Sequence, residues 1–198
     1  MTKKLSAPNG AKQSVVGASK QTDLKFYRAN EKPYGAFSNL YRCEIVFEGR
    51  RFATAEHAYQ AGKASKPAVR EWILQAPTPA LAAMAAHGLY TWDVVPNWAS
   101  IKVDRMRAVL RAKFSQYEEL RQLLLDTGSR RLVEAGTVNN AVNRFWGEVD
   151  GRGENTLGNL LMELRDELRK EKGSAMNGHL VPKAARNKKA VGAELAAA

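Results

Sequence analysis

The chain has 198 residues, of which 44% are hydrophobic and 26% are charged. This length and composition predict one folded domain with flanking segments and exclude a globally disordered chain. Cys43 is the only cysteine, which excludes an intrachain disulfide and a cysteine-based zinc site. The sequence shows no long apolar run and no signal peptide, so we expect a cytoplasmic protein without a membrane partner.

The formal net charge is +11, and much of it belongs to the two ends of the chain. Residues 1–23 and 173–198 are rich in small residues and lysine and show no periodicity. We expect them to form a flexible basic N-terminal arm and a flexible basic C-terminal tail. Such segments can contact nucleic acid nonspecifically, or they can simply keep the protein soluble. The folded domain is expected over residues 24–172.

The first part of this domain mixes short strands with a helix. LKFYRA at 24–29 predicts a strand, and CEIVFEGRRFA at 43–53 predicts a hairpin that turns near Gly49. Thr54 is expected to cap a helix over 55–65, because its hydroxyl can accept a bond from a free backbone N–H group.

Helix signals follow one another along the rest of the chain. First-turn prolines, a Thr-Pro cap, terminating glycines and apolar residues at helical spacing predict five further helices. These helices are expected over 67–76, 78–88, 97–114, 117–127 and 156–170. RRLVEAG at 130–136 predicts one more strand. The resulting fold class is α+β, a predominantly helical single domain with few short strands, and it does not suggest a repeating βαβ unit.

The segment TAEHAYQAGKA at 54–64 carries the densest set of polar side chains. On a helix, Glu56, Gln60 and Lys63 fall at positions i, i+4 and i+7, so they share one face. That face can be a solvated surface with a Glu–Lys pair, or it can be one wall of an active site. His57 points about 100° away and has no second histidine at metal-binding spacing, so no metal site is predicted.

A second candidate set lies on the expected helix over 97–114. Trp98 and Lys102 fall on the same stripe as apolar residues that belong to the core. A lysine on such a stripe either extends its ammonium group to solvent along the apolar surface or has a function.

Two loops add further candidates. The glycine-rich loop GEVDGRGENTLG contains Gly147 and Gly153 and is expected to end at Asn155 as a helix cap. It can bind a phosphate at the helix N-terminus, or it can be a tight structural turn. Ser38 and Asn39 follow an aromatic and glycine-containing segment, and they can form a turn or bind a ribose or phosphate.

In combination and in this order, the four sets resemble the NADAR family, also called YbiA-like. The resemblance covers about residues 25–170. It is carried by FSNLY at 37–41, the expected hairpin and TAEHAYQAGKA at 43–64, Trp98 through Met106 with KF at 113–114, LVEAG at 132–136 and FWGEVDGRGENTLGNLLMELR at 145–165.

The resemblance implies an N-glycosidase, a hydrolase that cleaves the C1′–N bond between a ribose and a base. It implies either the removal of ADP-ribose from guanine, in a nucleoside or a nucleic acid, or the cleavage of a phosphoribosylamino-pyrimidine of riboflavin synthesis. No cofactor or metal is expected. Glu56 is expected to do acid–base work or to stabilise an oxocarbenium ion. Lys63 or Lys102 is expected to form a Schiff base, and spacing alone does not choose between them.

The remaining site residues are expected to bind substrate: Trp98 or Trp146 by stacking on the base, and others by holding the sugar and phosphates. The expected substrate-binding residues are Ser38, Asn39, His57, Gln60, Trp98, Trp146, Gly147, Gly153, Asn155, Gly158 and Arg165.

One position departs from the family pattern. The family usually shows an aspartate shortly before the Trp-Gly pair, and Asn143 occupies that place in NRFWG. Glu148 or Asp150 could compensate for the missing carboxylate. The alternative to an enzyme is therefore a non-catalytic module that binds ADP-ribose or a nucleotide.

Overall fold

The computed structural model describes residues 22–178, so most of the two expected arms lies outside the described range. The strands are β1 (Leu24–Phe26), β2 (Ile45–Phe47), β3 (Arg50–Phe52) and β4 (Leu132–Glu134). The helices are α1 (Ala55–Ala61), α2 (Pro67–Leu74), α3 (Pro79–His87), α4 (Trp98–Gln116), α5 (Glu118–Leu125), α6 (Ala141–Trp146) and α7 (Thr156–Gly178), with short 3-10 helices η1 (Tyr34–Phe37) and η2 (Thr91–Asp93). This architecture confirms the predicted helix-rich α+β fold class.

The strands form two separate pairs. β1 and β4 are parallel, with Leu24 opposite Leu132, although more than a hundred residues separate them in the sequence. β2 and β3 form the predicted antiparallel hairpin. Its turn is made by Glu48 and Gly49, both with positive φ, which is the conformation that tight hairpin turns require.

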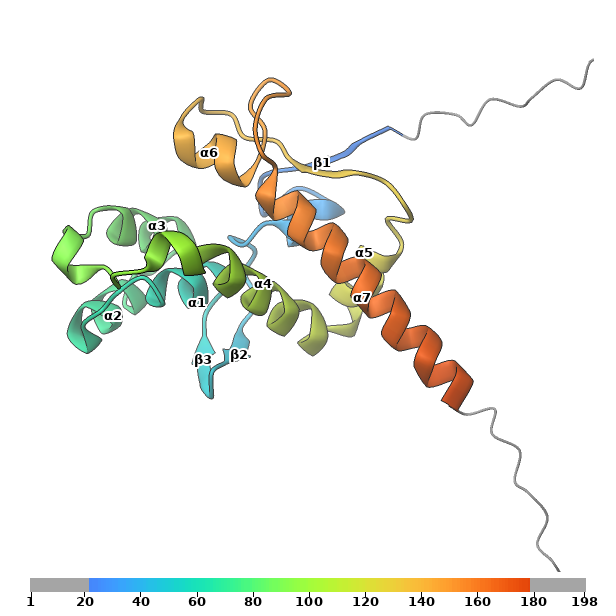
Figure 1. Ribbon diagram of the computed structural model, residues 1–198, viewed down its shortest axis with the longest axis horizontal. Helices are drawn as coiled ribbons and strands as arrows, with labels where there is room; N and C mark the ends of the chain where they lie inside the picture. Colours follow the sequence, from blue (N-terminus) through green and yellow to red (C-terminus); the bar gives the residue numbers. More distant parts are fainter. Residues whose placement is uncertain (1–21, 179–198) are drawn as a thin grey trace, which may run out of the picture.

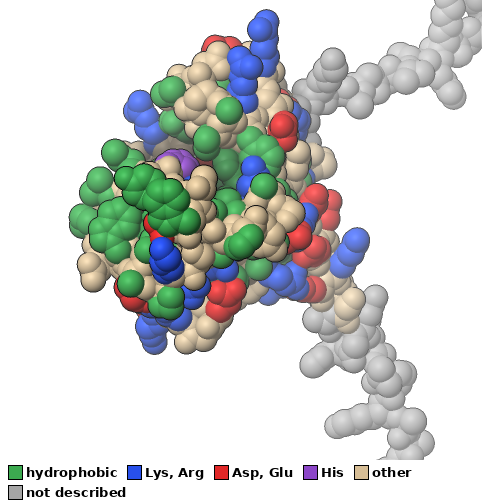
Figure 2. All heavy atoms as spheres, turned by 60° about the vertical axis from the view of Figure 1, so that its left-hand side comes forward, with side chains coloured by type: hydrophobic (Ala, Val, Ile, Leu, Met, Phe, Trp, Pro, Cys, Tyr) green, Lys and Arg blue, Asp and Glu red, His purple; other side chains and the backbone are tan. Residues whose placement is uncertain are grey.

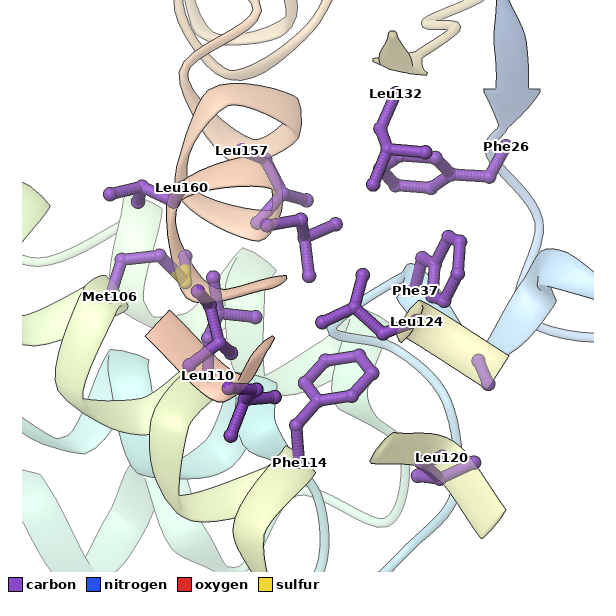
Figure 3. Close-up of a cluster of buried hydrophobic side chains, with 14 of the residues drawn as sticks. Phe26, Phe37, Met106, Leu110, Phe114, Leu120, Leu124, Leu132, Leu157 and Leu160 are labelled. Carbon is purple, nitrogen blue, oxygen red and sulfur yellow. The ribbon is translucent and has the colours of Figure 1, made fainter. Parts of the chain in front are cut away.

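The main hydrophobic core lies between α4, α5, α7 and the β1–β4 pair (Figure 3). The predicted apolar stripe of the last helix is buried in this core, and Leu161 is fully buried. Phe37 from η1 packs against Phe26 and Phe114, with ring centroids 5.6 and 6.1 Å apart. These contacts fix η1, and therefore the turn that follows it at residues 38–40.

α4 is the central helix of the arrangement, because it contacts α1 on one side and α7 on the other (Figure 1). α1 in turn packs against α2 and α3. The chain thus places α1, the start of α4 and the β4–α6 connection around a common space. Within residues 22–178, no helix has the length and apolar character needed to cross a membrane.

Two helices differ from the sequence expectation. α6 was not expected, and it begins where the Asn140 side chain accepts a 2.8 Å hydrogen bond from the backbone N–H of Asn143. α7 continues to Gly178, past residue 173, where the C-terminal tail was expected to begin. A run of charged helix-forming residues, RKEK at 169–172, is as compatible with a solvated helix as with a tail.

Candidate active site

A cavity of about 290 Å³ opens between α1, the first half of α4, α6 and the turn at residues 38–40. It gathers side chains from segments that are far apart in the sequence. The predicted site residues that line it are Ser38, Asn39, Glu56, Gln60, Lys63, Trp98 and Trp146. All four candidate sets therefore meet at one place, and the glycine-rich segment contributes through Trp146 and Leu157.

α1 supplies the polar wall of this cavity. Thr54 caps the helix as predicted, and its hydroxyl accepts a bond from the backbone N–H of His57. Glu56 and Gln60 are only 8% and 4% exposed, so the alternative of a solvated polar face is wrong. The Gln60 amide donates a 2.7 Å hydrogen bond to Glu56 Oε1. The polar face of α1 is therefore buried and internally paired.

A second carboxyl group reaches the cavity from the end of β4. Glu134 lines the cavity with Glu56, and sequence reasoning did not select it. Burial raises the pKa of Glu56 to about 7, against the lowering effect of the Gln60 hydrogen bond. Burial raises the pKa of Glu134 to about 7 as well, and the negative charge of Glu56 adds to this effect. Both carboxyl groups are therefore expected to titrate near neutral pH, where the charge of Glu56 opposes the ionisation of Glu134.

The two candidate lysines occupy different environments. Lys63 lines the cavity, and its ammonium group donates a 2.7 Å hydrogen bond to the carbonyl of Ala86. Partial burial lowers the pKa of Lys63, which increases the fraction of free amine. Lys102 does not line the cavity, and its Nζ lies 3.6 Å from the centroid of the Phe145 ring. The geometry therefore favours Lys63 over Lys102 as a reactive amine.

Aromatic rings from α1, α4 and α6 also line the cavity. Tyr59 lies between the two tryptophans, with ring centroids 5.2 Å from Trp98 and 5.6 Å from Trp146. Burial, followed by the charge of Glu56, raises the pKa of the Tyr59 phenol, so this group stays neutral. A planar base can stack on such a wall while its polar edge faces the carboxyl groups.

The turn at residues 38–40 presents an unpaired polar atom. Asn39 is buried, its Nδ2 lies 2.7 Å from the Met106 sulfur, and its Oδ1 has no partner among the described residues. Lys113 fixes the backbone of this turn, because its buried ammonium group donates to the carbonyls of Ala36 at 2.6 Å and Ser38 at 2.9 Å. A buried amide with an unused acceptor is suited to a ligand hydroxyl or N–H group.

The remaining predicted binding residues do not line the cavity. His57 is buried with its ring nitrogens near Thr54 Oγ1 and the Ala76 carbonyl, 2.8 and 3.1 Å away. Arg165 is 4% exposed and donates to Thr127 Oγ1 and the Arg130 carbonyl, 2.8 and 2.9 Å away. These contacts give both side chains a structural role, in contrast to the expected contact with substrate.

The glycine-rich loop acts as a tight structural connection. A Cβ atom at Gly147 would lie 2.3 Å from the Glu134 carbonyl oxygen, and one at Gly153 would lie 2.1 Å from the Gly147 carbonyl oxygen. A Cβ at Gly158 would lie 2.2 Å from the Leu132 carbonyl oxygen. These glycines allow the loop and α7 to pack against β4, which fixes the position of Glu134.

The Asn155 side chain also binds the backbone of β4. Its side chain was expected to cap α7, but its Oδ1 accepts a bond from the N–H of Glu134 and its Nδ2 donates to the carbonyl of Leu132. The residue has a positive φ of 52°, which asparagine tolerates better than most residues. Asn155 therefore helps to position Glu134 and does not face the cavity.

Neither of the two carboxylates that were expected to compensate for the missing family aspartate lines the cavity. Asn143 lines the cavity, and its Nδ2 donates to the Val138 carbonyl. Glu148 pairs with Arg131, and Asp150 lies exposed in the loop, so neither lines the cavity. Glu134 is the second carboxyl group of the cavity.

Three polar or charged cavity residues from the β1 and α3 ends were also not selected from the sequence: Tyr27, Arg28 and His87. Arg28 follows β1 and is exposed, so it can bind an anionic group at the mouth. His87 ends α3, and burial and the charge of Lys63 lower its pKa. The sequence carried no spacing signal for these residues, because they reach the cavity through the long-range β1–β4 pairing and the α1–α3 contact.

Within residues 22–178, no three His, Cys, Asp or Glu side chains lie together as possible metal ligands.

Comparisons with known proteins show which family the chain is similar to. The NADAR domain model matches residues 25–169. N-glycosidase YbiA of Escherichia coli (strain K12) is 40% identical over 161 residues, which cover 81% of this chain and 97% of that protein. N-glycosidase Npun_R5314 of Nostoc punctiforme is 36% identical over 150 residues, covering 74% of this chain and 92% of that protein.

Two further similarities concern a longer relative and a solved structure. Riboflavin biosynthesis protein VVA0006 of Vibrio vulnificus is 35% identical over 146 residues, covering 73% of this chain and 38% of that protein. The NMR structure of the Escherichia coli protein YbiA matches with a TM-score of 0.68 and 38% identity, covering 81% of this chain and 92% of that chain. The predicted enzyme class, a hydrolase of N-glycosyl compounds, is confirmed, and the chain belongs to the NADAR family.

Proposed function

We propose that the cavity cleaves the bond between C1′ of a ribose and the exocyclic amine of a base, and that its substrate is ADP-ribosylated guanine. The observation that carries this proposal is the pair of cavity carboxyl groups, Glu56 and Glu134, whose pKa values are both raised to about 7. Cleavage of a C1′–N bond requires a proton for the leaving nitrogen and a negative charge near the ribose.

The surroundings of the two carboxyl groups separate their roles. The Gln60 amide donates to Glu56 and so favours the ionised form of Glu56. The charge of Glu56 in turn favours a proton on Glu134. Glu134 would then protonate the leaving nitrogen, and ionised Glu56 would stabilise the positive charge on the ribose or activate water.

Lys63 offers a covalent route through the same cavity. A glycosylamine can open its sugar ring to an imine that joins C1′ to the nitrogen of the base. The Lys63 amine can add to C1′, and the base then leaves with its nitrogen as a free amine. Water then hydrolyses the lysine Schiff base, which releases ADP-ribose and restores the Lys63 amine.

Other residues of the cavity can bind the base, the sugar and the phosphates of the substrate. Trp98 and Trp146 can stack on the base, and Asn39 can pair with a sugar hydroxyl through its unused acceptor. Arg28 at the mouth can pair with a phosphate. A phosphoribosylamino-pyrimidine is the second candidate substrate, because one relative is named a riboflavin biosynthesis protein.

The test is to incubate the protein with ADP-ribosylated guanosine and, separately, with a phosphoribosylamino-pyrimidine, and to measure the released base by chromatography. Borohydride added during turnover reduces a Schiff base to a stable adduct, which peptide mass spectrometry can locate. We expect release of guanosine and an adduct on Lys63. Release from the pyrimidine substrate alone would make that compound the substrate, and release from neither would favour the binding-only module.

The matched control for the adduct is Lys102, which carries the same functional group outside the cavity. Lys63→Ala should abolish the adduct, and Lys102→Ala should leave it unchanged. An adduct on Lys102 would contradict the assignment of the amine. Full turnover without any adduct would indicate direct hydrolysis by the two carboxyl groups.

A further inference from the structure

The Tyr59 side chain lines the cavity, but its hydroxyl has no part in the reaction described above. Hydrophobic side chains gather on one face of the molecular surface (Figure 2), whereas Tyr59 is only 5% exposed. Its ring is held from two sides, because it contacts both Trp98 and Trp146. Tyr59 also follows Glu56 by three positions on α1, so the two side chains are neighbours on the helix. Tyr59 therefore lies between the proposed base-stacking rings and a cavity carboxyl group.

The Tyr59 hydroxyl is accessible and has no partner in the protein. It makes no hydrogen bond to any group within residues 22–178, although the hydroxyl of a buried tyrosine usually finds a partner. It is also not fully enclosed by the surrounding atoms, in contrast to the unpaired Oδ1 of Asn39. Because Tyr59 lines the cavity, its hydroxyl is available to a molecule that binds there.

The surroundings of this hydroxyl make it a donor that keeps its proton. Burial raises the pKa of the Tyr59 phenol, and the charge of Glu56 raises it further, against the opposite effect of Arg105. The phenol therefore stays protonated throughout the pH range in which Glu56 and Glu134 titrate. Such a group does not transfer its proton, but it can stabilise negative charge on a bound molecule by hydrogen bonding.

Three other donors that line the cavity are already engaged. The side chains of Gln60, Asn143 and Lys63 donate to a carboxylate or to a backbone carbonyl, at 2.7, 2.8 and 2.7 Å. Each of them would have to give up a protein hydrogen bond in order to bind substrate. The Tyr59 hydroxyl can bind an acceptor of the substrate without such a loss.

Guanine offers a matching acceptor next to the bond that breaks. The ring carbon that carries its exocyclic amine is also bonded to N3, an unprotonated ring nitrogen that gains negative charge when the base leaves. We infer that the Tyr59 hydroxyl donates a hydrogen bond to N3 of the guanine and so selects bases with an acceptor beside the exocyclic amine. This inference rests on the proposed function for the identity of the base, but its test requires no turnover.

The experiment measures the dissociation constants of free guanosine and of 3-deazaguanosine, in which a C–H group replaces N3, by titration calorimetry on the full-length protein. The unaltered protein should bind guanosine about 2- to 12-fold more tightly, the factor that corresponds to one hydrogen bond. Tyr59→Phe keeps the ring and removes only the hydroxyl. It should weaken guanosine binding by a similar factor and should not weaken the binding of 3-deazaguanosine.

The matched control is Tyr117→Phe, because the Tyr117 hydroxyl donates to the Glu44 carbonyl and does not line the cavity. This variant should bind both nucleosides like the unaltered protein. The inference would be overturned if Tyr59→Phe weakened both nucleosides equally, if it weakened neither, or if the unaltered protein did not bind guanosine. Turnover of ADP-ribosylated guanosine is measured separately, and its absence together with the expected binding pattern would contradict only the proposed function.

Discussion

At the scale of single residues, the two carboxyl groups of the cavity differ in what surrounds them. Glu56 lies on a helix beside Gln60, which donates to it, whereas Glu134 lies at the end of a strand and feels the charge of Glu56. Similar burial with unequal hydrogen bonding is how one site can hold an acid and a base at the same pH. In the sequence, helical spacing placed Glu56 on one face with Gln60 and Lys63, and the family resemblance implied its catalytic role.

The first prediction concerns the pH dependence of the reaction. With both pKa values near 7, kcat/KM should be bell-shaped with a maximum near neutral pH. The rate should fall above pH 7 as Glu134 loses its proton, and below pH 7 as Glu56 gains one. Glu134→Gln should lower kcat by about 10²- to 10⁴-fold and remove the alkaline limb. A Glu134→Gln profile that keeps the alkaline limb at the same pH would show that another group donates the proton.

The second prediction concerns stability. The folded-state pKa of Glu56 lies near 7, above its ordinary value of 4.5, so its ionisation destabilises the fold as pH rises through this range. Glu56→Gln should therefore raise the free energy of unfolding by about 3 kcal/mol at pH 8, and by much less at pH 5. Urea unfolding at the two pH values measures the difference.

The control for this stability effect is Glu154→Gln, since Glu154 is exposed in the loop before α7. It should change unfolding little at either pH. If Glu56→Gln raised the free energy of unfolding equally at pH 5 and pH 8, ionisation of Glu56 would not be the cause of the increase.

At the scale of elements, the site depends on how closely α7 and its preceding loop approach β4. Gly158 lies in the first turn of α7, where its missing side chain lets the Leu132 carbonyl come close. Asn155 closes the same contact with two hydrogen bonds to β4. The sequence indicated these residues as a possible phosphate site, and the structure assigns them the alternative role of a structural turn.

The third prediction compares two glycines of the same helix. Gly158→Ala should lower the free energy of unfolding by about 1–3 kcal/mol, because its Cβ would lie 2.2 Å from a backbone oxygen. Gly173→Ala meets no atom within 4 Å and should stabilise the helix by up to about 1 kcal/mol. Thermal unfolding of both variants gives the comparison. Equal effects of the two substitutions would show that α7 does not pack against β4 as described.

At the scale of the whole molecule, the cavity forms because long-range contacts bring together segments that are far apart in the sequence. Local sequence patterns contain no information on these contacts. Helical spacing and capping signals predicted α1 to α5 and the start of α7 within a few residues, because those signals are local. The parallel pairing of β1 with β4 is not encoded in any local pattern, and it brings Arg28 and Glu134 to the site. The four candidate sets were therefore identified from the sequence, whereas the second carboxyl group of the cavity was not.

The same long-range packing explains why some family-like residues do not face the cavity. His57 follows Glu56 directly, but the helix turns its ring toward Ala76 and away from the substrate space. Arg165 lies on the buried side of α7 and pairs with Thr127. Spacing within a motif fixes which residues share a face, while packing decides which face meets the ligand.

One measurement decides whether the cavity is the reaction centre: single-turnover release of guanosine from ADP-ribosylated guanosine by Glu56→Gln. The matched control is Glu148→Gln, because Glu148 was expected to compensate for the missing aspartate but pairs with Arg131 outside the cavity. We expect Glu56→Gln to slow release by about 10²- to 10⁴-fold while substrate still binds, and Glu148→Gln to remain near the unaltered rate. An unaltered rate for Glu56→Gln would contradict the assignment of the reaction to this cavity.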